Sequence, residues 1–150
     1  MRNIKCIIVF VMAVFITGCT HVKDAPTIEA FEEKMKEHHY ELIDRTNEVD
    51  YATKLYRINS EEFVFTFIKG KRKVDIEGLF IDECKNVVDE VGETDDRKQE
   101  IDSGTNWSYL KLSNSTYVYY VSWINDTYIY IKAAKNSGES IIKVAKELGY

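Results

Sequence analysis

The sequence has only one proline and seven glycines in 150 residues. So low a content of both argues against a disordered or low-complexity chain. The motifs G-x-S-x-G and H-E-x-x-H and the glycine-rich phosphate loop are also missing from it. These motifs carry serine hydrolysis, zinc-dependent hydrolysis and phosphate binding, so the sequence offers no sign of those activities. We expect no catalytic residue, no metal site and no cofactor.

A hydrophobic run long enough to span a membrane is missing as well. Residues 6–15 fall short of the roughly 20 that a transmembrane helix needs. The run follows two basic residues and ends at Ile-Thr-Gly-Cys at 16–19, which resembles the lipobox of bacterial lipoproteins. This resemblance implies a signal peptide over residues 1–18, transfer of diacylglyceryl to the Cys19 sulfur, and cleavage before Cys19. The alternative is an ordinary signal peptide with a chance cysteine.

The chain that remains after the expected signal peptide has the size of one domain. Basic residues and cysteines are both scarce in it. The 20 basic residues lose Arg2 and Lys5 with the signal, which leaves 18 against 25 acidic residues and a formal charge of −7. An acidic surface repels phosphate backbones and anionic lipid headgroups, so we expect no nucleic-acid partner. Besides Cys19, Cys84 is the remaining thiol, so no intrachain disulfide is expected.

The expected signal peptide also predicts where the protein is located. We expect a lipid-anchored protein on the extracytoplasmic face of the cell membrane, joined to the membrane through Cys19. A lipidated tether over residues 19–26 would precede a single domain over residues 27–150.

Apolar periodicity predicts the elements of the N-terminal half. A helix over 27–38, capped by Thr27, has one apolar stripe: Ile28, Phe31 and Met35. Alternation predicts a short strand over 40–46. Residues 52–58 and 62–69 most simply form a hairpin whose second arm places its phenylalanines on one face. The first arm, 52–58, is either strand or helix.

The spacing of the apolar residues changes from that of strands to that of a helix in the middle of the chain. Residues 74–91 predict an amphipathic helix with Gly92 as its stop, and its stripe comprises Phe80, Ile81, Cys84, Val87, Val88 and Val91. The charged residues 93–100 predict a solvated loop.

The C-terminal third has the clearest pattern, with strands over 106–112, 116–124 and 127–133. Asn125 and Asp126 suit a two-residue hairpin turn because both tolerate φ > 0. Strand 116–124 is apolar on both faces, which indicates a central strand covered on both sides. A last helix begins after Ser137 or Ser140 and ends at Gly149.

The predicted order is therefore α-β-β-β-α-β-β-β-α. This order is typical of an α+β fold. We expect a mainly antiparallel sheet of about five to six strands, with the helices packed largely on one face.

Three features together resemble small, uncharacterised lipoproteins of low-GC Gram-positive bacteria. They are the lipobox, the phenylalanine strand over 63–67 followed by a helix, and Tyr-Tyr-Val-Ser-Trp-Ile-Asn-Asp-Thr at 119–127 with Glu-Leu-Gly-Tyr at 147–150. The resemblance covers most of the chain after the signal, and its motifs are structural and imply no reaction. The pattern often has Arg before the Ile-Asp/Asn turn, where this chain has Trp123, and that departure removes whatever role such an Arg has.

Histidine and cysteine offer few reactive candidates. His38 and His39 are adjacent and so do not share a helix face, whereas helical metal ligands lie three or four residues apart. We expect exposed residues at a helix end. Cys84 has acidic neighbours and lies on an apolar stripe, which indicates a small buried hydrophobe rather than a catalytic thiol. Three N-x-S/T sequons are expected to be turn residues: Asn106, Asn114 and Asn125.

Aromatic residues concentrate on the C-terminal strands and are the candidates for ligand-facing side chains: Trp107, Tyr117, Tyr119, Trp123, Tyr128 and Tyr130. On an uncovered face they would form a platform for sugars or peptides. Aromatics are also ordinary strand formers that fill cores.

We expect a non-catalytic binding or support module whose partner is a cell-envelope protein or a small ligand. One alternative is a cell-envelope hydrolase that uses carboxylates. The other is a lipoprotein that captures its ligand on a face rich in tyrosine and tryptophan.

Overall fold

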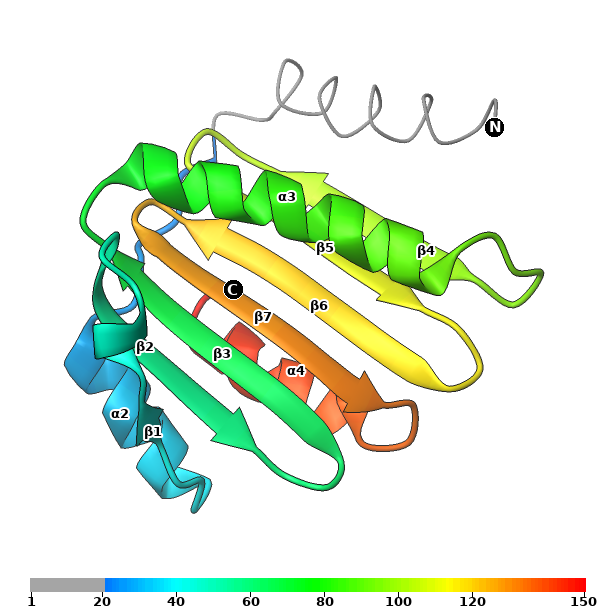
Figure 1. Ribbon diagram of the computed structural model, residues 1–150, viewed down its shortest axis with the longest axis horizontal. Helices are drawn as coiled ribbons and strands as arrows, with labels where there is room; N and C mark the ends of the chain where they lie inside the picture. Colours follow the sequence, from blue (N-terminus) through cyan, green and yellow to red (C-terminus); the bar gives the residue numbers. More distant parts are fainter. Residues whose placement is uncertain (1–20) are drawn as a thin grey trace.

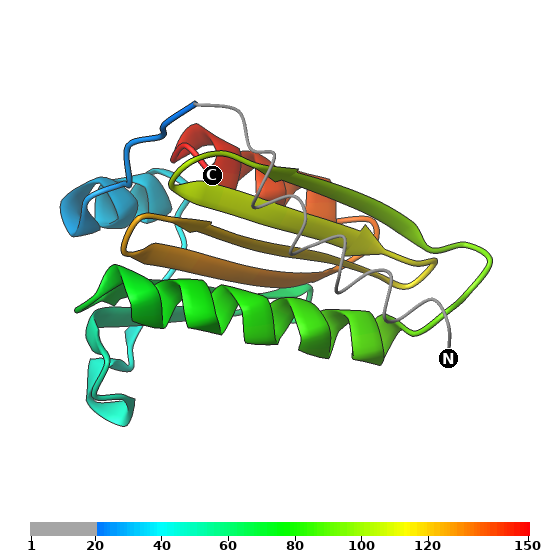
Figure 2. The ribbon, with the colours of Figure 1, turned by 90° about the horizontal axis from the view of Figure 1, so that it is seen from above.

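The computed structural model describes residues 21–150 as an antiparallel sheet between two layers of helix (Figures 1 and 2). The strands are β1 (Ile43–Asp44), β2 (Ala52–Asn59), β3 (Phe63–Gly70), β4 (Lys98–Ser103), β5 (Trp107–Ser113), β6 (Tyr117–Ile124) and β7 (Thr127–Ala134). The α-helices in these residues are α2 (Ile28–Glu37), α3 (Lys73–Val91) and α4 (Gly138–Glu147), and a 3₁₀ turn, η1, spans Thr46–Glu48. The expected signal peptide and Cys19 lie outside the described residues.

The strands follow the order β1-β2-β3-β7-β6-β5-β4, and each pairs with its neighbours in the antiparallel sense. Two meanders, β1 to β3 and β4 to β7, therefore meet at the central pair β3–β7. Helix α3 connects one meander to the other. The predicted α+β class with an antiparallel sheet is confirmed.

Helices α2 and α4 pack on one face of the sheet, which we call the α2/α4 face. Thr27 begins α2 as predicted, because its Oγ1 accepts a hydrogen bond from the Ala30 N–H at 3.1 Å. The Phe31 ring of α2 stacks on Phe67 with centroids 4.1 Å apart and meets Phe65 edge-on at 5.8 Å. These two β3 rings share one buried face, as their alternation predicted.

Helix α4 lies beside α2, close to β6 and β7. Gly138 permits this approach, because a Cβ at that position would overlap Val118 Cγ1 of β6. The buried side of α4 completes the core of this face: Ile141, Ile142, Val144 and Ala145.

Helix α3 packs on the opposite face, which we call the α3 face. It ends at Gly92, whose φ of 65° is the left-handed value expected of a helix stop. Its buried stripe contains Ile76 together with five of the six predicted residues: Phe80, Cys84, Val87, Val88 and Val91. The predicted Ile81 is only partly buried. Strand β6 contributes Tyr119 and Val121 to this core and Tyr120 to the other, so it is covered on both sides as predicted.

The expectation that the helices lie largely on one face is wrong. Figure 2 shows α3 on one side of the sheet and α2 with α4 on the other. The reason lies in β6 and β7, whose side chains are buried on both faces. A sheet that is apolar on both sides must be covered on both sides.

The number of strands is also corrected, from five or six to seven. Strand β4 includes residues that were expected in the solvated loop 93–100. It is an edge strand with one neighbour, β5, so it needs little apolar surface, and Ile101 alone packs toward the α3 face. Charges along an edge also discourage pairing with other chains. Of the strand expected over 40–46 only β1 forms, and 52–58 is strand rather than helix.

Candidate functional site

Five of the six aromatic candidates point to the α3 face: Tyr117, Tyr119, Trp123, Tyr128 and Tyr130. Helix α3 lies over three of them, and Tyr119, Trp123 and Tyr128 are at most 5% exposed. They are core residues, because the helix occupies the surface on which a ligand would have to sit. Tyr117 and Tyr130 remain partly accessible at the margin.

Trp107, the sixth candidate, is buried on the α2/α4 face. The structure therefore does not bring the six aromatic side chains together on one open platform.

The thiol and the imidazoles occupy the positions that the sequence predicted. Cys84 is buried in α3, and burial raises the pKa of its thiol, so it stays protonated at neutral pH. His38 and His39 are exposed at the end of α2, with His38 Nε2 at 3.4 Å from Glu147 Oε2. Within residues 21–150, no cluster of three or more His, Cys, Asp or Glu side chains is arranged to hold a metal ion.

The segment that precedes α2 is bonded to the turn between β4 and β5. The His21 carbonyl oxygen accepts hydrogen bonds from Trp107 Nε1 at 3.0 Å and from the Thr105 N–H at 3.3 Å. The Lys23 N–H donates to Asn106 Oδ1 at 3.0 Å, and Asn106 Nδ2 donates back to the Lys23 carbonyl at 2.7 Å. We call this set of contacts, made by His21, Lys23, Thr105, Asn106 and Trp107, the tether clasp.

The tether clasp is closely packed. A Cβ on Gly104 would overlap both Trp107 Nε1 and the His21 carbonyl oxygen, so only glycine fits beneath the tether. Lys23 Nζ lies 4.1 Å from the centroid of the Trp107 ring, at cation–π distance. Burial lowers the pKa of Lys23 against the opposing attraction of Asp102. Residues 21–26 therefore belong to the folded domain rather than to a free linker.

Asn106 was expected both as a turn residue and as the first residue of strand 106–112; it lies in the turn, since β5 begins at Trp107. The sequence did not predict the clasp. The Asn106 side chain pairs with a residue 83 positions earlier in the chain. No local pattern marks such a pair, because it depends on how the sheet brings distant segments together.

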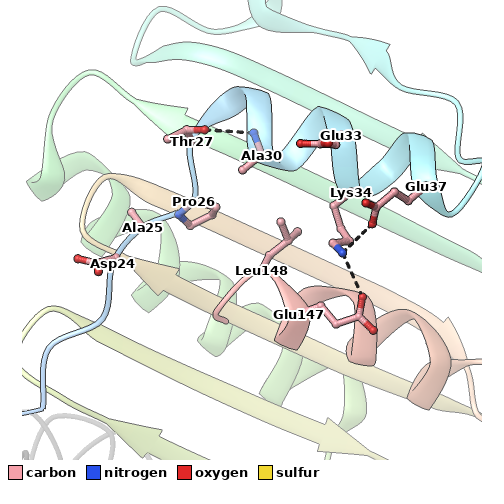
Figure 3. Close-up of a pocket in the computed structure, with 10 residues that line it drawn as sticks. All are labelled: Asp24, Ala25, Pro26, Thr27, Ala30, Glu33, Lys34, Glu37, Glu147 and Leu148. Carbon is pink, nitrogen blue, oxygen red and sulfur yellow. Dashed lines mark hydrogen bonds and ion pairs between the residues drawn. The ribbon is translucent and has the colours of Figure 1, made fainter.

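Directly after the clasp, the chain borders a groove between the two helices of the α2/α4 face (Figure 3). This α2–α4 groove has a volume of about 510 Å³, within the range of small-molecule sites. Residues at helical spacing on α2 form one wall: Ala30, Glu33, Lys34 and Glu37. The tether residues 24–26 and the end of α4, with Glu147 and Leu148, form the rest.

Four carboxylates border this groove against one amine. Figure 3 shows Lys34 reaching across it, with Nζ at 2.7 Å from Glu37 Oε2 and 3.5 Å from Glu147 Oε2. The hydrogen bond that Lys34 donates to Glu37 raises the pKa of Lys34, and chiefly the hydrogen bond with His38 lowers the pKa of Glu147. Lys34 and Glu147 are thus both ionised at neutral pH, and the groove carries negative charge.

This electrostatic arrangement favours ionic binding over acid catalysis. A carboxyl that donates a proton needs a raised pKa, whereas the pKa of Glu147 is lowered. Burial does raise the pKa of Glu83, but Glu83 belongs to α3 on the opposite face.

The fold and these surfaces define a three-layer α+β domain with its N-terminal tether built onto the end of the sheet. Comparison of the chain with protein-family models, with curated proteins and with solved structures finds no match. Of the helices in residues 21–150, none has the length and apolar character that crossing a membrane requires.

Proposed function

We propose that this protein is a lipid-anchored binding module on the extracytoplasmic face of the cell membrane. Acyl chains on Cys19 hold it there, and the α2–α4 groove receives a basic segment of a cell-envelope protein without catalysis. The observation that carries the proposal is the lipobox at 16–19 followed, two residues later, by a tether that is bonded to the domain.

The groove supports the binding part of the proposal by its shape and charge. Ala30 and Leu148 offer apolar surface, while Glu33, Glu37 and Glu147 surround it with carboxylates. A Lys or Arg side chain combines an apolar stem with a cationic head, and it matches both parts of such a groove. Exposed ion pairs of this kind contribute little individually, so the expected affinity is modest and decreases with salt.

The anchor is tested by metabolic labelling of growing cells with a radioactive fatty acid. Wild-type protein is expected to carry label and to sediment with membranes, whereas the Cys19→Ala variant is expected to carry none. Equal label in both proteins would refute lipidation at Cys19.

The groove is tested by affinity capture from a cell-envelope extract with the detergent-solubilised full chain. The test variant is Glu33→Gln/Glu37→Gln/Glu147→Gln, and the control is Glu41→Gln/Glu61→Gln/Glu93→Gln, which removes the same charge from exposed positions elsewhere. The proposal expects a protein that wild type and control capture, that the groove variant loses, and that 0.5 M salt releases. A partner retained equally by all three proteins would exclude the groove as its binding surface.

A further inference from the structure

Helix α4 divides the α2/α4 face into two regions of opposite charge. On one side lies the acidic α2–α4 groove. On the other side, no described helix covers β4 and β5 on this face of the sheet, and their side chains form an open surface beside α4. We call this surface the lysine ledge.

The register of the sheet fixes which side chains reach the ledge. Glu100 of β4 pairs with Lys111 of β5, which pairs with Tyr120 in the core of the α2/α4 face. Paired residues of antiparallel strands share a face, so Glu100 and Lys111 point to the α2/α4 face. Lys98 and Asp102 each lie two residues from Glu100 along β4 and therefore point to the same face.

Helix α4 contributes the other wall of the ledge. Lys111 Nζ lies 2.6 Å from Glu139 Oε1, which turns that flank of α4 toward β5. Lys143 and Lys146 follow Glu139 at i+4 and i+7, on the same side of the helix, and both are exposed. Glu139 borders a hollow of about 300 Å³ together with Lys135 and residues of β4 and β5.

Lysines also lie at both ends of the ledge. At one end, Lys135 Nζ donates to Ser113 Oγ at 2.9 Å. At the other end, Lys23 lies over the Trp107 ring within the tether clasp. Lys23 is close enough to Asp102 and Lys146 for both charges to affect its pKa.

The ledge is therefore positive on a protein that is otherwise strongly acidic. Its lysines are Lys23, Lys98, Lys111, Lys135, Lys143 and Lys146, and its carboxylates are Glu100, Asp102 and Glu139. These give a formal charge of +3, whereas residues 21–150 as a whole carry −7 and the rest of them therefore −10. The positive charge is concentrated at one place on the surface, so the acidic overall composition does not reveal it.

The tether clasp places this positive surface beside the expected anchor. His21 is hydrogen-bonded to the turn at which the ledge begins. Two residues of extended chain reach at most about 7 Å, so the acyl chains on Cys19 would enter the bilayer next to this end of the ledge. We infer that the lysine ledge is a second membrane contact, which binds the anionic headgroups of phospholipids and lays this edge of the sheet on the bilayer.

This inference rests on the proposed anchoring at Cys19. Each lysine near an anionic membrane adds an attraction that decays over a Debye length of about 10 Å at 0.1 M salt. The Lys111–Glu139 ion pair adds no net charge, so the attraction comes from the +3 that the ledge carries with its three carboxylates counted. With the ledge on the bilayer, the domain has a fixed orientation rather than a loose attachment.

The test uses acylated full-length protein, purified in detergent and added to preformed vesicles of phosphatidylcholine with or without 30% phosphatidylglycerol. Flotation of the vesicles reports the anchor. A water-soluble acetylating reagent, read by mass spectrometry, reports the accessibility of each lysine. The control lysines lie on other surfaces: Lys36, Lys54 and Lys85.

On vesicles with phosphatidylglycerol, we expect Lys111, Lys143 and Lys146 to react at least about three-fold more slowly than on neutral vesicles. The protection should disappear in 0.5 M salt, and the control lysines should react equally on both vesicles. As a second reading, Lys111→Gln/Lys143→Gln/Lys146→Gln should abolish the protection of Lys98 and Lys135, whereas Lys36→Gln/Lys54→Gln/Lys85→Gln should leave it unchanged.

The outcomes separate the two proposals. Protein that floats on both vesicles with equal reactivity of ledge and control lysines would overturn the ledge and leave the anchor intact. Protein that floats on neither would overturn both. Protection by soluble polyphosphate but not by anionic vesicles would assign the ledge to an anionic polymer, and would also overturn the inference.

Discussion

Replacement of Asn106 by alanine should detach the tether from the sheet and destabilise the domain. The Asn106 side chain makes three hydrogen bonds, two with the Lys23 backbone and one from Nδ2 to Asn125 Oδ1 at 3.0 Å. Asn106 is only 6% exposed, so water does not readily replace these partners while the tether stays in place. The Asn125 N–H also donates to the Asn106 carbonyl at 2.8 Å, a backbone bond that alanine would keep.

The size of the effect follows from these three bonds. Each contributes about 0.5–1.5 kcal/mol net, so we expect a loss of roughly 2–4 kcal/mol in the free energy of unfolding. For a domain of about 130 residues, 1 kcal/mol corresponds to a change of about 4 °C in Tm. The expected decrease in Tm is therefore roughly 8–16 °C.

Thermal unfolding of the detergent-solubilised protein, followed by circular dichroism, measures the decrease. Hydrogen exchange measures the clasp directly, since the Lys23 amide should lose its protection in Asn106→Ala. Asn136→Ala removes the same side chain from an exposed turn and should change stability by less than about 0.5 kcal/mol. A decrease in Tm below 2 °C, with the Lys23 amide still protected, would refute the role given to Asn106.

Three further predictions concern the cores. Phe31→Ala removes the ring that stacks on Phe67 and should lower the free energy of unfolding, measured by chemical denaturation, by about 3–5 kcal/mol. The control Val74→Ala, at a position 62% exposed, should lower it by less than about 0.5 kcal/mol. Equal losses in the two variants would contradict the packing of Phe31. The Cys84 thiol, whose pKa burial raises, should resist iodoacetamide at pH 8 until denaturant is added, as labelling of its peptide would show. Burial raises the folded-state pKa of Tyr128 and Tyr150 above the usual value of about 10. The resulting stabilisation is complete below about pH 10 and is lost as the pH rises above it, because the unfolded chain ionises first. Absorbance at 295 nm should thus rise together with the loss of circular dichroism, and full ionisation of an intact fold would disprove this coupling.

The local elements were predictable from the sequence because periodicity records which side chains share a face. The stripe of α3, the cap at Thr27 and the alternation of β6 all appear in the structure where the sequence indicates them. Strand β4 was not predicted because an edge strand is held by backbone hydrogen bonds to one neighbour, and its single apolar residue, Ile101, is only partly buried and leaves almost no pattern.

The sequence by itself thus determined the antiparallel α+β class and the elements of the core, and it predicts an anchor at Cys19. Periodicity says which residues of an element are buried together, but not which element covers them. Only the tertiary structure decided that helices lie on both faces, so that α3 buries three of the six aromatic candidates. It alone joined Lys23 to Asn106, and it alone gathered acidic residues on one side of α4 and lysines on the other. The physical reason is that these surfaces are built by residues far apart in the chain, which the order of strands brings together.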